Sequence, residues 1–260
     1  MPVLRAVALV LTILLFLVVV SPLYLLFIRF RPSARAAMPL LFCRIMCRLL
    51  RVRVRPRGEM ARERPLLLVP NHISWVDIVV LGSTEFTAFL AKKEVAGWPL
   101  LGPLAKVQGA LFVDRGRRRQ IPAVNRQMAE RMQAGDPVIL FAEATTGDGT
   151  HLLKFHTPHF EACRDLMKAF PEVTTVYVQP IVIDYNRRDG LALGRAGRAN
   201  IAWYGDTGFT PHLWSMLKSG PTECLVDYLP PRPMALADHR KAMAAMIQSD
   251  IRQNRWRQVP

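Results

Sequence analysis

The feature that most constrains this chain is an apolar run near its beginning. Ala6 to Ile28 is a stretch of 23 residues without a charged side chain. A helix of that length, at about 1.5 Å per residue, measures roughly 34 Å, slightly more than a bilayer core. Arginines follow the run in place of a small-residue cleavage site, which argues against a cleaved signal peptide. The sequence therefore predicts an N-terminal membrane-inserted helix kinked at Pro22, compatible with a full span or a re-entrant or interfacial pose.

A basic collar comes directly after this run. Residues 29–64 hold eleven arginines against two glutamates, and so carry +9 of the chain's net charge of +15. Arginines beside a membrane segment mark its cytoplasmic side and attract anionic headgroups. We therefore expect an anionic membrane surface as a partner and a catalytic domain on the cytoplasmic side of a bacterial-type inner membrane. No nucleic-acid-binding signature accompanies the charge, so nucleic acid is not an expected partner.

Three segments are predicted from these patterns. Residues 1–30 form the membrane segment, 31–64 a basic interfacial helix and collar, and 65–260 the remaining domain. Within the collar, Leu41, Ile45 and Leu49 recur at helical spacing with arginines between them. That pattern is typical of a helix lying at a membrane interface.

Beyond residue 65, short apolar runs alternate with helical patterns. Strands are predicted at 66–69, 87–90, 110–113, 138–141 and 175–183, and helices at about 74–82, 120–134, 159–169 and 236–254. This alternation is typical of an α/β fold with helices packed on a central sheet. A chain of 260 residues can bury such a core without disulfides or metal.

The first string that carries chemistry follows a predicted strand. His72 and Asp77 are five residues apart, where the strand at 66–69 ends and a helix begins. An aspartate on the first helical turn can accept a hydrogen bond from one imidazole nitrogen and leave the other as a base. Alone, a histidine near an aspartate is more often structural.

Two further strings end predicted strands. Gly109 to Gly116 runs into a basic turn, whose guanidinium groups can hold an anionic headgroup or form a solvated loop. Phe141 to Gly149 places polar residues beyond a strand end, where α/β sheets bind ligands.

Taken in order, these strings resemble the motifs of the glycerolipid acyltransferase family, typified by 1-acylglycerol-3-phosphate acyltransferases. His72 and Asp77 match its first motif, and an apolar strand containing Pro180 is similar to its fourth. The resemblance covers most of the chain and implies a mixed central sheet flanked by helices. It assigns catalysis to His72 and Asp77. It assigns substrate binding to Asp114 and Arg115 of the second motif, to Glu143, Thr145 and Thr146 of the third, and to Pro180.

The third motif departs from the family pattern. Ala142, Ala144 and Thr146 stand where the family has proline, glycine and arginine. The family's arginine is thought to meet the acceptor phosphate, so lysophosphatidate is a less favoured acceptor here. Residues 143–149, 202–206 and 211–214 look like the branch that acylates lyso-ornithine lipid. Two alternatives are lysophosphatidate held by Arg115 and Arg117, and a catalytically inactive lipid-binding membrane protein.

The resemblance implies direct acyl transfer without a cofactor. His72 removes the proton of the acceptor hydroxyl as it attacks an acyl thioester, and Asp77 orients His72. Glu143 and Thr145 are expected to position the acceptor and Arg115 its polar head. The donor is acyl carrier protein or acyl-coenzyme A, either of which is acidic enough to be steered by a positive surface.

No metal site is predicted. His151, His156 and His159 lack a helical two-histidine and glutamate spacing, and the resembling family uses no metal. The four cysteines, Cys43, Cys47, Cys163 and Cys224, form no disulfide or zinc pattern and are expected to be buried thiols.

Overall fold

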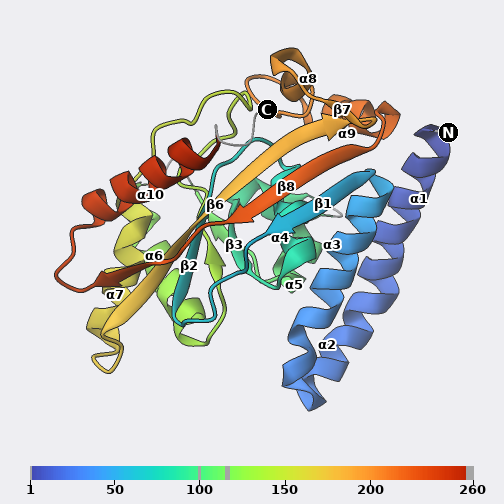
Figure 1. The fold of residues 1–260 in the computed structure, drawn as a ribbon. Helices are drawn as coiled ribbons and strands as arrows, with labels where there is room; N and C mark the ends of the chain where they lie inside the picture. The colour runs from blue at the N-terminus through green and yellow to red at the C-terminus, as the bar shows by residue number, and fades with distance from the viewer. Residues whose placement is uncertain (1, 99–100, 115–117, 256–260) are drawn as a thin grey trace.

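The computed structural model describes residues 2–98, 101–114 and 118–255. Within these ranges, nine strands form one mixed sheet in the order β1-β8-β6-β2-β5-β3-β4, with β7 and β9 also pairing with β6 (Figure 1). The strands are β1 Val52–Arg57, β2 Leu66–Pro70, β3 Ala88–Lys92, β4 Leu111–Val113, β5 Val138–Ile139, β6 Thr175–Arg188, β7 Leu191–Ala192, β8 Thr222–Tyr228 and β9 Arg232–Ala235. The expected α/β fold with a mixed central sheet and flanking helices is confirmed.

The helices alternate with these strands along the chain. They are α1 Pro2–Leu15, α2 Ser21–Phe30, α3 Ala37–Leu49, α4 Val76–Thr84, α5 Leu101–Val107, α6 Ile121–Gln133, α7 Glu161–Ala169, α8 Arg195–Ala199, α9 Phe209–Lys218 and α10 Arg240–Arg255. Every predicted strand and helix of the domain is present. The patterns missed the strands β1, β7, β8 and β9 and the helices α5, α8 and α9, which are short or have polar residues, charges or proline among their apolar residues.

Alternate residues of β2 enter two separate cores. Leu66 and Leu68 pack in a core with α1, α3, α4 and α9, whereas Leu67 and Val69 pack in a core with α6, α7 and α10. A strand covered on both faces must be apolar at every position, which explains its unbroken apolar sequence. Helices therefore cover both faces of the sheet. The cysteine prediction is also confirmed, since all four thiols are free and buried.

The N-terminal helix is continuous from Pro2 to Phe30 and is apolar and long enough to cross a membrane. A π-helical turn over Phe16–Val20 lies just before Pro22, where a kink was predicted. Ser21 donates its backbone N–H to the carbonyl of Phe16, five residues back. Widening the turn in this way lets a helix pass a proline that has no N–H to donate.

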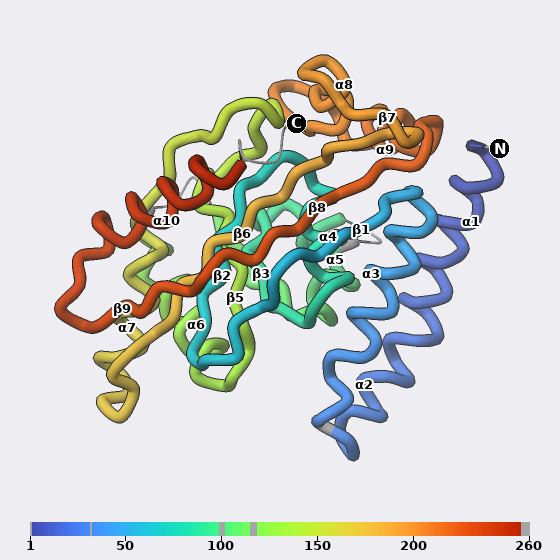
Figure 2. Tube along the Cα trace, viewed as in Figure 1, coloured from blue at the N-terminus to red at the C-terminus, as the bar shows by residue number. Residues whose placement is uncertain are grey.

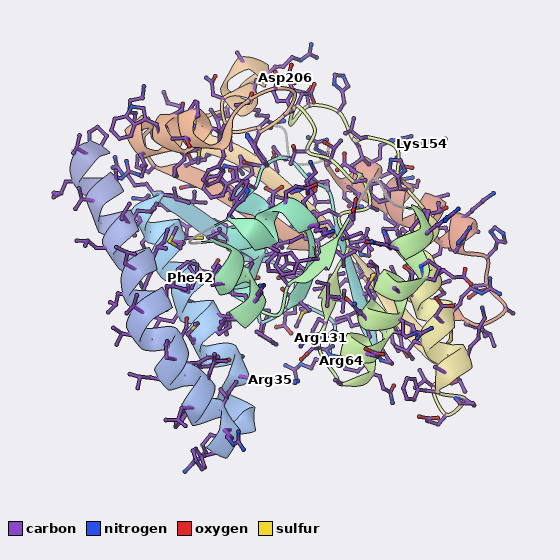
Figure 3. All side chains as sticks on the ribbon, turned by 180° about the vertical axis from the view of Figure 1, so that it is seen from behind. Arg35, Phe42, Arg64, Arg131, Lys154 and Asp206 are labelled. Atoms are coloured by element: carbon purple, nitrogen blue, oxygen red, sulfur yellow. The ribbon has the colours of Figure 1, made fainter. Side chains whose placement is uncertain are left out.

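This helix and α3 form a hairpin along one flank of the domain (Figure 2). Phe42 of α3 faces the long helix, and its ring lies 5.1 Å from that of Phe16 (Figure 3). Arg5 donates to the carbonyl of Leu217 in α9 at one end of the hairpin. Arg35, at the other end, lies 2.7 Å from the buried carboxylate of Asp136. The hairpin is therefore held to the domain at both ends.

The apolar face of α3 differs from the predicted one. Its buried residues are Met38, Pro39, Phe42, Cys43, Met46 and Cys47, which pack towards α4 and the long helix. Leu41 is 51% exposed, while Ile45 and Leu49 are half-buried. The predicted apolar residues therefore lie on the more exposed side of α3, and the helix buries a second, larger apolar face.

Part of the basic collar belongs to the sheet. β1 is an edge strand that pairs in parallel with β8, and its Arg53 and Arg55 are exposed. Arg57 instead donates to the Asp227 carboxylate at 3.0 Å. Charges on an edge strand prevent pairing with other chains, so these three arginines have structural roles besides any contact with lipid.

Candidate active site

Asn71 sets the position of the candidate base. Its side-chain amide donates to the carbonyl of Ile183 at 3.0 Å and accepts from the Ile183 N–H at 2.7 Å. The side chain thus continues the β2–β6 ladder one step past Pro70, where the main chain has already left the sheet. His72 consequently projects from the carboxyl end of a central parallel strand, the place where α/β sheets bind ligands.

The carboxylate of Asp77 holds His72 and its own turn. One oxygen lies 2.9 Å from His72 Nδ1 and accepts the backbone N–H groups of Ile73 at 2.7 Å and Ser74 at 2.9 Å. Asp77 has no solvent exposure. Because an ionised carboxylate only accepts, the neutral imidazole carries its proton on Nδ1. Nε2 then has a free lone pair, as a general base requires.

A tyrosine that sequence reasoning missed completes the group. Tyr185 of β6 donates its hydroxyl to the other oxygen of Asp77 at 2.8 Å. Burial and the adjacent Asp77 carboxylate raise the pKa of Tyr185 far above its ordinary value, so the hydroxyl keeps its proton. β6 is buried at every position from Val178 to Tyr185, so no alternation in the sequence singled this tyrosine out.

The imidazole of His72 is fixed from a third side. Its ring stacks on Phe141 with centroids 3.9 Å apart and an angle of 24° between the planes. His72 is 8% exposed. Contacts on the ring face and on Nδ1 leave it little freedom to rotate.

Glu143 has a structural role in addition to the one expected. Its two carboxylate oxygens accept the backbone N–H of His72 and of Leu153, each at 2.7 Å. Glu143 is buried and ties the loop after β5 to the His72 turn. Glu143 thus has a structural role that the motif did not indicate, and its predicted contact with the acceptor stays a prediction.

Burial raises the pKa of Glu143 to about 7, while the two backbone N–H groups and Arg255 act against that rise. Arg255 itself is buried and donates to the carbonyl of Gly149. A second buried acid, Asp184, lies 3.6 Å from Arg198, and burial raises its pKa as well. The third-motif loop thus rests on a buried network of charges.

The departures in the third motif have structural readings. Ala144 has φ of +59°, a left-handed conformation that glycine adopts without strain, and the family has glycine there. Thr145 is exposed. Thr146 donates its hydroxyl to the carbonyl of Trp203, so in this structure the hydroxyl holds a neighbouring segment.

That neighbouring segment braces the catalytic turn. Trp203 donates its backbone N–H to the carbonyl of Ile73 at 2.9 Å. Trp75 donates its indole N–H to Nδ1 of His212 at 3.0 Å, and His212 Nε2 lies 3.2 Å from the carbonyl of Ile201. Burial lowers the pKa of His212. The sequence singled out residues 202–206 and 211–214 only as similar to the lyso-ornithine lipid branch. It did not predict that they bond to the His72 turn.

The remaining predicted substrate residues are not gathered at His72. Asp114 follows β4, three strands from β2 at the same sheet edge, roughly 14 Å away at about 4.8 Å per strand. Lys93 lies 3.9 Å from it. Pro180 is buried inside the sheet opposite Val69, where the antiparallel partner of β6 changes from β9 to β8. Pro180 therefore lies within the sheet, and its predicted contact with substrate stays a prediction. Arg115 and Arg117 lie outside the described residues.

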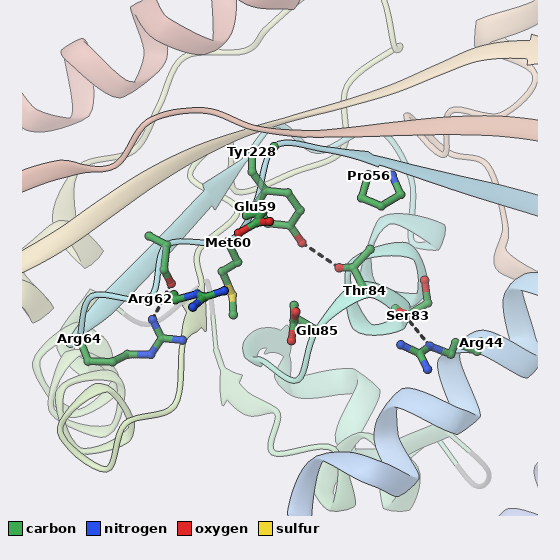
Figure 4. Close-up of a pocket in the computed structure, with 12 residues that line it drawn as sticks. Arg44, Pro56, Glu59, Met60, Arg62, Arg64, Ser83, Thr84, Glu85 and Tyr228 are labelled. Carbon is green, nitrogen blue, oxygen red and sulfur yellow. Dashed lines mark hydrogen bonds between the residues drawn. The ribbon is translucent and has the colours of Figure 1, made fainter.

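A separate cavity of about 570 Å³ lies at the opposite edge of the sheet (Figure 4). The hydroxyls of Thr84 and Tyr228 meet across it at 2.8 Å, and Arg44 bonds the Ser83 carbonyl at its rim. None of the predicted site residues lines it. Among the residues that the structure describes, no group of three His, Cys, Asp or Glu side chains is arranged to hold a metal.

Comparisons with known proteins agree with this geometry. The model of the family described as Acyltransferase matches residues 51–184. A lyso-ornithine lipid O-acyltransferase of Brucella abortus (strain 2308) is 38% identical over 231 residues, 89% of this chain and 86% of that protein. Its namesake from Rhizobium meliloti (strain 1021) is 39% identical over 80% of this chain and 71% of that protein.

Among solved structures, the chain resembles the 1-acyl-sn-glycerophosphate (LPA) acyltransferase PlsC from Thermotoga maritima. The TM-score is 0.64, the sequence identity is 18%, and all of each chain is covered. At that identity the likeness shows a shared fold.

Proposed function

This chain belongs to the acyltransferase family and is an O-acyltransferase, and from that premise we propose that it acylates the free hydroxyl of lyso-ornithine lipid with an acyl thioester. The observation that carries the chemistry is the His72–Asp77–Tyr185 arrangement at the carboxyl end of β2. The observation that favours the acceptor is the name shared by relatives at 35–39% identity.

His72 acts as the general base in this proposal. Nε2 takes the proton of the acceptor hydroxyl while the oxygen of that hydroxyl attacks the thioester carbonyl. The imidazolium then passes the proton to the sulfur of the donor, which leaves as a thiol. Asp77 holds the tautomer and stabilises the imidazolium that forms. A thiolate leaves readily, so activation of the hydroxyl is the demanding step.

Thr146 supports the choice of acceptor. A threonine whose hydroxyl is bonded to the Trp203 carbonyl offers no charge to a phosphate. An ornithine headgroup carries a carboxylate and an ammonium and needs no such charge at this position. Lysophosphatidate is the alternative, since the 1-acyl-sn-glycerol-3-phosphate acyltransferase of Neisseria gonorrhoeae is 29% identical over 75% of this chain and 72% of that protein.

The N-terminal hairpin, formed by the membrane segment and the first half of the collar, is the proposed membrane anchor. Fourteen large apolar side chains of the long helix are exposed by 39–75%. Because Arg5 and Arg35 fasten the hairpin to the domain at both ends, a pose along the membrane interface fits better than a full span. The catalytic domain then lies on the cytoplasmic side, where the chain's net charge of +15 attracts an acidic acyl carrier protein or coenzyme A.

The test is an acyl-transfer assay with membrane fractions, labelled acyl carrier protein thioester or acyl-coenzyme A, and either lyso-ornithine lipid or lysophosphatidate. Selective acylation of lyso-ornithine lipid, lost in His72→Ala, is the expected result. Preference for lysophosphatidate would keep the reaction and overturn the acceptor. Transfer to neither acceptor would contradict both.

A further inference from the structure

The described part of the chain exposes few large apolar side chains outside the hairpin of α1, α2 and α3. They number five, namely Leu191, Tyr204, Trp214, Leu236 and Met246. Leu191 is 75% exposed, Tyr204 44% and Trp214 40%, and all three fall within 24 residues of chain. We call these three the apolar shoulder. Leu236 and Met246 lie on or beside β9 and α10, away from it (Figure 1).

The shoulder adjoins the start of the long helix. Figure 1 and the reverse view in Figure 3 both place α9 and β7 beside the first turns of α1. Arg5 of α1 donates to the carbonyls of Leu217 and Ser219 at the end of α9. Val3 and Leu4, on those first turns, are 63% and 73% exposed. The shoulder therefore continues the exposed apolar surface of the hairpin onto the catalytic domain.

The outer side of α9 has an interfacial composition. His212, Met216 and Leu217 are its buried residues, whereas Trp214 and Lys218 are exposed one turn apart. Tryptophan and tyrosine prefer the boundary between lipid and water, where the ring is apolar and the N–H or O–H stays hydrated. Lysine beside them reaches the headgroups.

Charge plays a minor part on this surface. Between residues 187 and 218, the segment that carries the shoulder, the exposed ionised residues are Arg187, Arg195 and Lys218 against Asp189 and Asp206. Their net charge is +1. A contact there depends on burying aromatic and aliphatic groups, in contrast to the arginine-rich collar. The two surfaces should therefore differ in their response to salt.

We propose that the apolar shoulder is a second membrane-contact surface, by which the catalytic domain itself rests on the lipid bilayer beside the hairpin. The partner is a lipid surface, because the shoulder is continuous with the apolar face of the hairpin. This inference rests on the membrane association proposed above and goes beyond it by naming a contact made by the domain.

The shoulder segment is bonded to the catalytic turn. The Trp203 N–H reaches the Ile73 carbonyl, and the Trp75 indole reaches His212 of α9. Seating Tyr204 and Trp214 in the headgroup region thus fixes the height of the His72 turn above the bilayer. A lysolipid keeps its remaining acyl chain in the membrane, so its hydroxyl stays close to the headgroup region. His72 can reach that hydroxyl only if the His72 turn lies at the same height.

Site-directed labelling tests the contact. All four native cysteines are buried and burial raises the pKa of each thiol, so a maleimide fluorophore will label an introduced surface cysteine selectively. The full chain is reconstituted with vesicles of phosphatidylcholine and phosphatidylglycerol that carry a nitroxide near the headgroup. Trp214→Cys reports on the shoulder, Leu26→Cys on the hairpin, and Met246→Cys, at similar exposure, on the far side.

Strong quenching at positions 214 and 26 with little at 246 is the expected result, and at 214 it should persist in 0.5 M salt. Quenching at 26 but not at 214 would overturn the shoulder and leave the membrane anchor intact. Absence of quenching at both positions would contradict the anchor as well. A 214 label shielded by self-association in detergent, and not by lipid, would assign the surface to a second copy of the chain.

A kinetic comparison adds a functional measurement. Trp214→Ser should raise the apparent KM for a vesicle-embedded acceptor by about three- to tenfold and leave kcat and the rate with micellar acceptor nearly unchanged. Met246→Ser is the matched control and should change neither. Equal loss with both presentations of the acceptor would assign Trp214 to packing and overturn the proposal.

Discussion

Tyr185 donates its hydroxyl to the carboxylate oxygen of Asp77 that His72 does not use, over 2.8 Å. The two residues are 108 positions apart, and the contact joins strand β6 to the first turn of α4. With His72 and two backbone N–H groups on the other oxygen, a fully buried carboxylate has its full set of partners. A buried charge keeps a fixed geometry when each of its oxygens has hydrogen-bond partners, as here.

Tyr185→Phe removes one of those partners and nothing else of comparable size. An unpaired oxygen on a buried carboxylate costs about 1–3 kcal/mol, so thermal unfolding in detergent should begin several degrees earlier. Acyl transfer should fall while the KM for the acceptor stays constant, because Asp77 orients His72 and does not touch substrate. Tyr177→Phe, on the same strand, is the control. Wild-type rates in Tyr185→Phe would show that Asp77 needs no third partner.

His72→Asn separates the base from the hydrogen bond. An asparagine amide can still donate to Asp77 but offers no basic nitrogen, so turnover should fall by about 10²–10⁴-fold. Unfolding should shift less than in His72→Ala, which also loses the contact with Asp77 and the stacking on Phe141. His156→Ala, an exposed histidine, should behave as wild type. Turnover within a few-fold of wild type in His72→Asn would refute the general-base role.

Ala144→Gly should stabilise the protein. Ala144 has φ of +59°, where a Cβ costs roughly 1 kcal/mol that glycine avoids, partly offset by the greater freedom of glycine in the unfolded chain. We expect the unfolding temperature to rise by about 1–3 °C with activity retained. Ala142→Gly, at a buried neighbour without positive φ, should lower it. A lower unfolding temperature for Ala144→Gly would contradict the strain.

Glu143→Gln tests the tie between two loops. A glutamine oxygen can accept one of the two N–H groups of His72 and Leu153, and its NH₂ then faces the other. The variant should lose about 1–3 kcal/mol of unfolding free energy at low pH, and acyl transfer should fall as the His72 turn loosens.

This loss depends on pH in a defined direction. Burial raises the pKa of Glu143 to about 7 in the folded protein. A raised pKa means that the folded state holds the proton more tightly, so the contribution is complete below the unfolded value near 4.3 and is lost as pH rises through about 7. The stability advantage of wild type over Glu143→Gln should therefore be larger at pH 5 than at pH 8. A larger advantage at pH 8 would mean that the carboxylate is stabilised on folding.

The local sequence pattern was enough to predict contacts between residues that are close together in the chain. The apolar strand, the turn and the helix start place His72 and Asp77 on one turn, and the 2.9 Å contact is the one expected. Tyr185 was missed because its partner lies across the sheet. The motif strings also gave no sign that Glu143 accepts two backbone N–H groups of its own chain or that Pro180 lies inside the sheet.

The hairpin shows the same limit. The run from residue 6 to 28 predicted an apolar helix, since length and charge suffice for that. The interfacial pose proposed above rests on Arg5 and Arg35, whose partners lie at residues 217 and 136. No spacing within the segment carries that information, because the partners are set by the packing of the domain.

The pairing of β1 with β8 has a consequence for how the molecule assembles. Val52 aligns with Thr222, so the edge next to the hairpin closes only when segments about 170 residues apart meet. Pairings of such separation are slow, because the entropy of a long loop is lost before the contact forms. If the hairpin binds a bilayer early in folding, β1 and β8 need to find each other only at the membrane surface. Refolding should accordingly be faster on vesicles than in dilute micelles, with the late phase reported by probes on β1 and β8.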